Sequence, residues 1–194
     1  MKLSELASVR SGLVLARKLS KGTTPYQYPL LNLRSIQQDG TIDFLTTDSY
    51  HAVEPLKPEY LSSPGDIVMR LTAPYTAVLI DESASNMVIS SNFVVIRTEH
   101  RLLLPEDLFW LLNTQNIRHL IYENATSNML GAVTARFLGE LEIALLPMDA
   151  QKKIAQIKGL ARGEPQLLKQ LAAEKEKYCS LLLEQFYTYT KRGN

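Results

Sequence analysis

Short apolar runs separated by turn-forming residues dominate the first two thirds of the chain. Asp39-Gly40, residues 63–66 and residues 81–86 supply the aspartate, glycine, proline and asparagine that favour turns. The runs between them are five to eleven residues long and rich in valine, isoleucine and leucine, which is typical of strands. This pattern predicts strands at residues 28–34, 66–71, 76–80 and 87–97.

The periodicity becomes helical after these strands. Proline suits the first turn of a helix, and acidic side chains stabilise the positive end of the helix dipole. Pro105, Glu106 and Asp107 therefore predict a helix over residues 105–113. The elements expected next are a second helix at 115–123, a polar loop at 124–131, a short turn of helix and a strand at 141–145.

The character of the chain changes after Pro147. Asp149 is a good N-cap for a helix that starts at Ala150, and Gly163-Glu164-Pro165 should interrupt that helix. Residues 165–190 hold no further glycine or proline, and a helix of this length is about 39 Å long. Its a and d positions form an imperfect coiled-coil seam of Leu168, Leu171, Lys175, Tyr178, Leu182, Gln185 and Tyr189.

Packing of this last helix back onto the preceding domain is the alternative, although a domain of about 150 residues needs a shorter capping helix. The predicted fold class is α+β, with a mixed β-rich domain at residues 1–148. Residues 149–194 form a long C-terminal helical segment of the coiled-coil type.

Composition and charge narrow the classes of function. Hydrophobic residues make up 45% of the 194 positions and charged residues 21%, as in ordinary globular proteins. No apolar run approaches the roughly 20 residues of a membrane span, and the N-terminus lacks a signal-peptide pattern. Cys179 is the only cysteine, so we expect no disulfide framework and a cytoplasmic location.

The net charge of +1 is unevenly distributed. Residues 1–149 hold 12 basic and 16 acidic side chains, whereas residues 150–194 hold 9 basic and 4 acidic ones. Residues 6–38 contain no acid, which predicts either a cationic edge for nucleic acid or a local asymmetry of the surface. The basic residues of this stretch are Arg10, Arg17, Lys18, Lys21 and Arg34.

Motifs for catalysis are absent from the sequence. His51, His100 and His119 do not lie at metal-ligand spacing with Cys179 or with a carboxylate, so we expect no metal site. No glycine-rich phosphate loop and no GxSxG nucleophile motif occurs. Pro74-Tyr75 lacks the remainder of an amino-methyltransferase motif. An enzyme with unrecognised carboxylates stays open as an alternative, without a constellation in its favour.

The order of the signals resembles the specificity subunits of Type I restriction–modification systems, in nearly the whole chain. Residues 3–12 (LSELASVRSG) are similar to the leader of a target-recognition domain, and residues 28–43 resemble its next strand and turn. The family's "pGDil" strand is resembled by residues 60–71, which contain PGDIV. Its later partner strand is resembled by residues 89–97. Residues 108–157 are similar to its helix, closing strand, "P…Q" turn and first conserved-region helix.

This resemblance implies a non-catalytic subunit that recognises double-stranded DNA. S-adenosylmethionine would belong to the partner modification (methyltransferase) subunit, so no cofactor is expected here; a restriction subunit is a further candidate partner. Full-length family members hold two recognition domains and two spacer helices, whereas this chain holds one of each. We therefore expect a homodimer, with Leu168, Leu171, Tyr178 and Leu182 at its interface.

Within the family, loops of the recognition domain read base edges in the major groove. Arginine and asparagine suit guanine and adenine, while lysine and threonine more often hold phosphate. For each candidate, a solvated surface role is the alternative. The polar and basic groups on loops and strand ends that we single out are Lys18, Lys21, Thr23, Arg34, Arg70, Thr72, Ser127, Asn128 and Arg136.

A second reading is an interaction or decoy module that docks on a methyltransferase subunit through its helices without binding DNA. The net charge of −4 over residues 1–149 favours this reading. Sequence-dependent DNA binding in the presence of the methyltransferase would separate the two.

Overall fold

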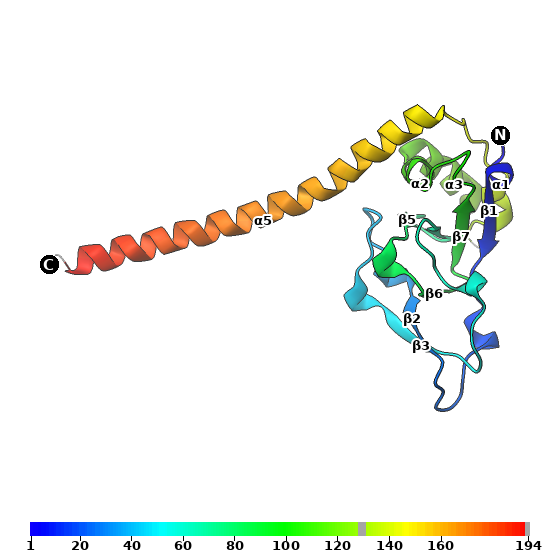
Figure 1. The fold of residues 1–194 in the computed structure, drawn as a ribbon, viewed down its shortest axis with the longest axis horizontal. Helices are drawn as coiled ribbons and strands as arrows, with labels where there is room; N and C mark the ends of the chain where they lie inside the picture. The colour runs from blue at the N-terminus through cyan, green and yellow to red at the C-terminus, as the bar shows by residue number, and fades with distance from the viewer. Residues whose placement is uncertain (128–130, 193–194) are drawn as a thin grey trace. The chain divides into compact units, whose positions relative to one another are not determined.

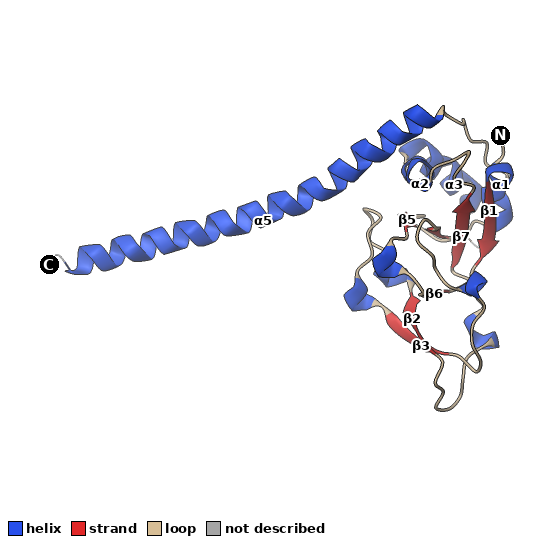
Figure 2. Ribbon diagram, viewed as in Figure 1, coloured by secondary structure: helices blue, strands red, loops and turns tan. Residues whose placement is uncertain are grey.

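The structure is a computed structural model that describes residues 1–127 and 131–192. The chain forms two compact units, Met1–Ile154 and Ala155–Asn194. The first unit contains two sheets and several helices (Figure 1), whereas the second consists of helix alone (Figure 2). The predicted α+β class, a β-rich part followed by a long helix, is confirmed.

The larger sheet has four antiparallel strands in the order β1-β7-β4-β5. Alternate residues of its central strands face opposite cores: Ile67 and Met69 pack with the helices, whereas Val68 packs on the other side. Burial on both faces explains why these strands read as continuous apolar runs. The strands are β1 (Ala7–Ser11), β4 (Ile67–Arg70), β5 (Ala77–Leu79) and β7 (Phe93–Thr98).

Four helices of the first unit complete the core on one face of this sheet. Leu3, Leu108, Leu112 and Ile121 are fully buried among them. The helices at residues 105–113 and 115–123 were predicted, and both are confirmed within a few residues. The four helices are α1 (Leu3–Leu6), α2 (Pro105–Leu112), α3 (Gln115–Thr126) and α4 (Ala135–Gly139).

The second sheet has three strands in the order β3-β2-β6, with β2 and β3 antiparallel and β2 and β6 parallel. It lies away from α2 and α3 in the first unit (Figure 1) and has its own small core around Leu30, Tyr50 and Val88. Its strands are β2 (Gln27–Leu31), β3 (Asp48–His51) and β6 (Val88–Ile89).

Several predicted strands differ from the observed ones. The predicted strand at 87–97 is divided between two sheets, because residues 90–92 turn the chain and Leu13 donates its N–H to the carbonyl of Ile89. The predicted strand at 28–34 ends at Leu31, where a 3₁₀ turn follows. Residues 141–145 make only an isolated bridge with Lys2, since the chain after Lys2 becomes helical.

The long helix α5 runs without a break from Met148 to Arg192, so the predicted interruption at residues 163–165 is wrong. Proline removes one backbone N–H, a local cost of about 3 kcal/mol, and strong helix formers on both sides continue the helix. The predicted start is also wrong: Asp149 lies inside the first turn, and the carbonyl of Pro147 accepts from the N–H groups of Ala150 and Gln151.

Candidate nucleic-acid interface

The first group of predicted contact residues lies at one end of the second sheet. The N–H of Ser20 donates to the carbonyl of His51 at 2.8 Å, which holds the segment of residues 18–23 against the end of β3. Lys18 is paired with Glu54, and this carboxylate raises the pKa of the Lys18 amine. Lys21 and Thr23 are exposed, and no ion pair joins Lys21 to the described residues.

Arg34 lies at the other end of the same strand pair. Its guanidinium forms an ion pair with Asp48 and donates to the carbonyl of Thr46 at 3.2 Å. The Arg34 side chain is nevertheless 67% exposed, so it can still reach a ligand. His51, which accepts from Ser20, and Asp48, which pairs with Arg34, are three residues apart on β3. The points at which the two segments attach to this strand therefore lie about 10 Å apart.

Arg70 is embedded in the protein. Its Nη1 atom donates to the carbonyl of Leu33 at 3.2 Å and its Nη2 atom to the carbonyl of Ala73 at 3.1 Å. Its Nε atom is buried without a hydrogen-bond partner, and burial lowers the pKa of the guanidinium. The nearby predicted contact Thr72 is exposed at the turn after β4.

The late polar loop reaches the same turn. The hydroxyl of Tyr75 donates to the carbonyl of Gly131 at 3.0 Å, and the N–H of Val133 donates to the carbonyl of Leu71 at 3.0 Å. Of the predicted contacts here, Arg136 is exposed on α4, and the Ser127 hydroxyl donates to the carbonyl of Asn124. Asn128 lies outside the described residues.

The structure thus divides the predicted contacts into two places. Arg34, Arg70, Thr72 and the loop around Gly131 meet on one side, because hydrogen bonds join residues 33, 71, 73 and 75 to their distant neighbours. Lys18, Lys21 and Thr23 gather at the far end of β2 and β3. Which of them contact DNA stays a prediction.

The motif residues of the sequence have structural roles. Asp66 of the PGD turn is only 1% exposed, and it accepts two hydrogen bonds of 2.7 Å from Arg97. This ion pair joins the two stretches that look like the family's strand pair. The "P…Q" residue Gln151 is equally buried and bonds to Leu102, Leu104 and Leu146. The sequence analysis assigned Asp66 and Gln151 to motifs, but it did not predict that both side chains are buried.

Tyr75 is a residue that the sequence analysis missed. Its φ of 53° is unusual for a bulky side chain, and such strain often marks a functional turn. The sequence offered only one signal, the isolated Pro74-Tyr75 pair, which no motif explained.

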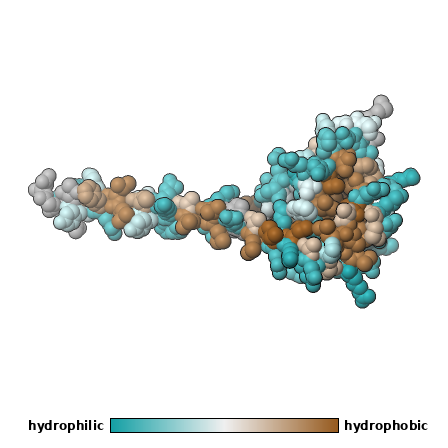
Figure 3. Space-filling view, turned by 90° about the horizontal axis from the view of Figure 1, so that it is seen from above, coloured by the Kyte–Doolittle hydropathy of each residue, from teal (hydrophilic) through white to brown (hydrophobic). Residues whose placement is uncertain are grey.

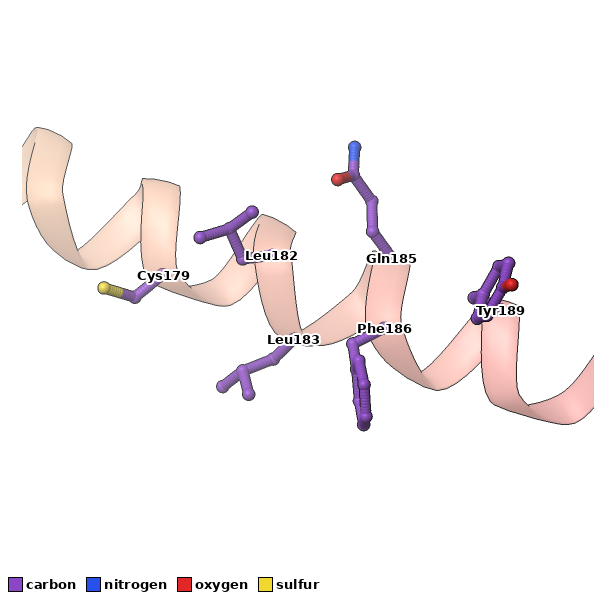
Figure 4. A pocket seen from close by; sticks show the side chains of 6 residues that line it. All are labelled: Cys179, Leu182, Leu183, Gln185, Phe186 and Tyr189. Atoms are coloured by element: carbon purple, nitrogen blue, oxygen red, sulfur yellow. The ribbon is translucent and has the colours of Figure 1, made fainter.

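The second unit presents apolar side chains along the helix, between polar ones (Figure 3). The four predicted interface residues, Leu168, Leu171, Tyr178 and Leu182, are 45–64% exposed in the single chain. In the close view of residues 179–189, Leu182 and Gln185 point to one side of the helix, and Leu183 and Phe186 point to the other (Figure 4). The helix therefore carries a second apolar row beside the predicted seam.

Residues 1–127 and 131–192 contain no cluster of three histidine, cysteine or acidic side chains that could hold a metal ion. None of the helices described is both long enough and apolar enough to cross a membrane.

Comparison with solved structures identifies the fold. The chain superimposes on the HsdS subunit from Thermoanaerobacter tengcongensis with a TM-score of 0.64 and 20% identity, covering 94% of this chain and 46% of that one. It matches a chain from a study of complex assembly and conformational transition of the type I R-M system with a TM-score of 0.63, again at 20% identity with 94% and 46% covered. This chain has the fold of a Type I specificity subunit.

A third match is the Type I restriction–modification system S subunit from M. genitalium, with a TM-score of 0.53 and 13% identity over 89% of this chain and 41% of that one. The chain therefore spans less than half the length of the specificity subunits it matches. No family model and no curated protein matches the sequence.

Proposed function

We propose that this chain is the DNA sequence-recognition subunit of a Type I restriction–modification complex that methylates adenine. The observation that carries the proposal is the specificity-subunit fold over 94% of the chain, which covers 46% of each of two solved neighbours. The chain itself is non-catalytic. Double-stranded DNA and a methyltransferase subunit are its partners, and a restriction subunit is a further candidate.

The exposed apolar side chains of α5 support a homodimer. Two copies related by a two-fold axis would place two recognition units in one particle. The exposed seam of Leu168, Leu171, Tyr178 and Leu182 is the surface for this association. Cys179 and Leu183, which are exposed on another side of the helix, are candidates for contact with the methyltransferase subunit.

A matched pair of variants tests the dimer. Leu171→Asp introduces a charge in the seam, and Ala173→Asp introduces the same charge at an f position on the opposite side of the helix. Burying one leucine is worth about 1.5–3 kcal/mol, and the change occurs twice per dimer, so we expect Leu171→Asp to weaken association by roughly 10²–10⁴. Ala173→Asp should sediment as the wild-type dimer. A monomeric wild type contradicts the homodimer.

The symmetry of such a dimer restricts its DNA target. Two identical recognition units must read the same half-site on opposite strands. The 38 helical residues from Ala155 to Arg192 are about 57 Å long, which favours half-sites separated by on the order of one to two turns of about 35 Å. We expect methylated adenines to lie in an interrupted palindrome. Mapping methylated adenines in cells with and without this chain tests the function, and an asymmetric target would require a second, different half-subunit.

Salt dependence tests the cationic segment. If Lys21 holds one phosphate, Lys21→Ala lowers the slope of log affinity against log salt by about one unit. We expect a smaller change for Lys18→Ala, because Glu54 already neutralises Lys18. Lys57→Ala serves as the control, since Lys57 is exposed outside this segment. Equal slopes in all three variants would remove residues 18–23 from the interface.

The second candidate is an interaction or decoy module that docks on the methyltransferase without binding DNA. The net charge of −4 over residues 1–149 and the pairing of Lys18 and Arg34 with acids favour it. Quantitative binding of duplex DNA to the complex with the methyltransferase distinguishes the two. Tight binding that depends on sequence supports recognition, and its absence supports the decoy.

A further inference from the structure

We propose that the turn of residues 72–75, between β4 and β5, reads base edges in the DNA, and that Arg70 is its positioning residue and makes no DNA contact. This inference rests on the proposed function and deepens it. It assigns the specificity to one exposed turn and gives the nearby arginine a structural task.

Strain in the backbone singles out this turn. Tyr75 has a φ of 53°, in the left-handed region that a bulky side chain rarely adopts. Such a conformation persists only where the surroundings enforce it. The ring of Tyr75 is 5% exposed within the main core, and its hydroxyl donates to the carbonyl of Gly131. The N–H of Tyr75 closes the turn on the carbonyl of Thr72 at 3.1 Å.

The Arg70 side chain joins the turn to another segment through two hydrogen bonds. One guanidinium nitrogen donates to the carbonyl of Ala73 inside the turn, and another donates to the carbonyl of Leu33 in a different segment. A planar guanidinium presents these two donors on separate nitrogens in a fixed geometry, whereas the three donors of a lysine lie on one freely rotating nitrogen and hold two carbonyls less rigidly. Two of the five N–H groups of Arg70 donate to backbone carbonyls and its Nε atom is buried, so part of the guanidinium is committed to holding the turn.

The held turn exposes an uncharged surface. Thr72, Ala73 and Pro74 are exposed, and they offer one hydroxyl and two small apolar groups. Threonine hydroxyls donate to or accept from base edges, and small apolar groups contact the methyl of thymine. This surface lacks a charge for phosphate, so it is suited to base readout, and an A·T pair is the base pair it fits best.

Neighbouring segments supply a positive charge and further polar groups, which the turn itself lacks. Arg34 follows Leu33, whose carbonyl Arg70 holds, and its side chain is 67% exposed and cationic. Gly131 and Val133 join a further segment to the turn, through the carbonyl of Gly131 and the N–H of Val133. Three segments far apart in the sequence therefore converge here, which is the arrangement that a rigid reading site requires.

Three variants of the full chain, each assembled with the methyltransferase, test the inference. Thr72→Val removes the hydroxyl with little change of shape, Arg70→Lys keeps the charge but not the double contact, and Thr188→Val on α5 is the control. The measurement is the affinity for the preferred duplex divided by that for duplexes with one base pair changed, at several salt concentrations. We expect this ratio to fall roughly tenfold in Thr72→Val and Arg70→Lys, at one base-pair position of each half-site.

The salt slope separates positioning from contact. A positioning residue leaves the slope unchanged in Arg70→Ala, whereas loss of a phosphate contact lowers it by about one unit. Thermal melting shows whether an Arg70 variant folds. If it does not fold, the discrimination measured for Thr72→Val, at an exposed position, tests the inference by itself. Unchanged discrimination in Thr72→Val, or a lowered slope in a folded Arg70→Ala, overturns the inference. If the wild-type complex shows no sequence-dependent binding, the proposed function fails instead.

Discussion

Replacement of Gln151 by alanine should destabilise the first unit markedly. The Gln151 side chain is 1% exposed and makes three hydrogen bonds to backbone atoms. Its Oε1 atom accepts from the N–H of Leu104 at 2.8 Å, and its Nε2 atom donates to the carbonyls of Leu102 at 3.0 Å and Leu146 at 2.8 Å. One side chain at the start of α5 therefore fixes the segments that precede α2 and α5.

The magnitude follows from these bonds. Each contributes about 1 kcal/mol net, so Gln151→Ala should lower the free energy of unfolding by about 3 kcal/mol. For a chain of this size, 1 kcal/mol corresponds to about 2–4 °C, and the melting temperature should fall by about 6–12 °C. Gln151→Glu should be no better, because it keeps the acceptor for Leu104 but places a second oxygen against two carbonyls.

Thermal melting followed by circular dichroism measures the effect. Gln156→Ala is the matched control, since it makes the same chemical change at an exposed position of the same helix. It should stay within about 0.5 kcal/mol of the wild type. If Gln151→Ala and Gln156→Ala melt within about 2 °C of each other, the buried amide does not fix these segments and the reasoning is wrong.

Three further changes have defined outcomes. Gly12→Ala should abolish soluble expression, because a Cβ atom at this position would lie 2.3 Å from the carbonyl oxygen of Ser90; Gly22→Ala, where the space is open, should be tolerated. Arg97→Ala leaves the buried Asp66 without its guanidinium and should cost about 3 kcal/mol in urea unfolding, with Arg97→Lys in between. Burial raises the pKa of Asp107 above its ordinary value of 3.8, so the free energy of unfolding falls as pH rises through that higher pKa. Asp107→Asn removes this charge, so it should raise the melting temperature at pH 7 and give no gain below about pH 3.8.

The local pattern predicted α2, α3 and the central strands, but it did not predict β1, β3 or the continuity of α5. Helices α2 and α3 and strands β4 and β5 lie where the apolar periodicity and the turn formers predicted them. The order of motifs predicted the specificity-subunit fold as well, and in this chain the motif residues hold a turn and an ion pair. The PGD turn is one example, since Asp66 accepts from the N–H of Ser63 within the turn and from the distant Arg97.

For the candidate site, the sequence analysis predicted which residues to consider, but it did not predict which of them are already paired inside the protein. No local pattern indicated that Lys18 is paired with Glu54, 36 positions away, or that Arg70 donates to the carbonyls of Leu33 and Ala73. Both look like free cations when they are read alone. The strain at Tyr75 was equally hidden, because it arises from contacts with the core and with Gly131.

The sequence alone therefore determined several of the helices and strands, where many turns lie and which fold the motifs resemble. These features depend on neighbours within a few residues, where side-chain periodicity and turn propensity act. The tertiary structure decided which strands share a sheet, why residues 87–97 divide between two sheets, and which polar groups remain available to a ligand. Those outcomes depend on hydrogen bonds between segments distant in the chain, such as the one that joins Leu13 to Ile89, and no local pattern contains them.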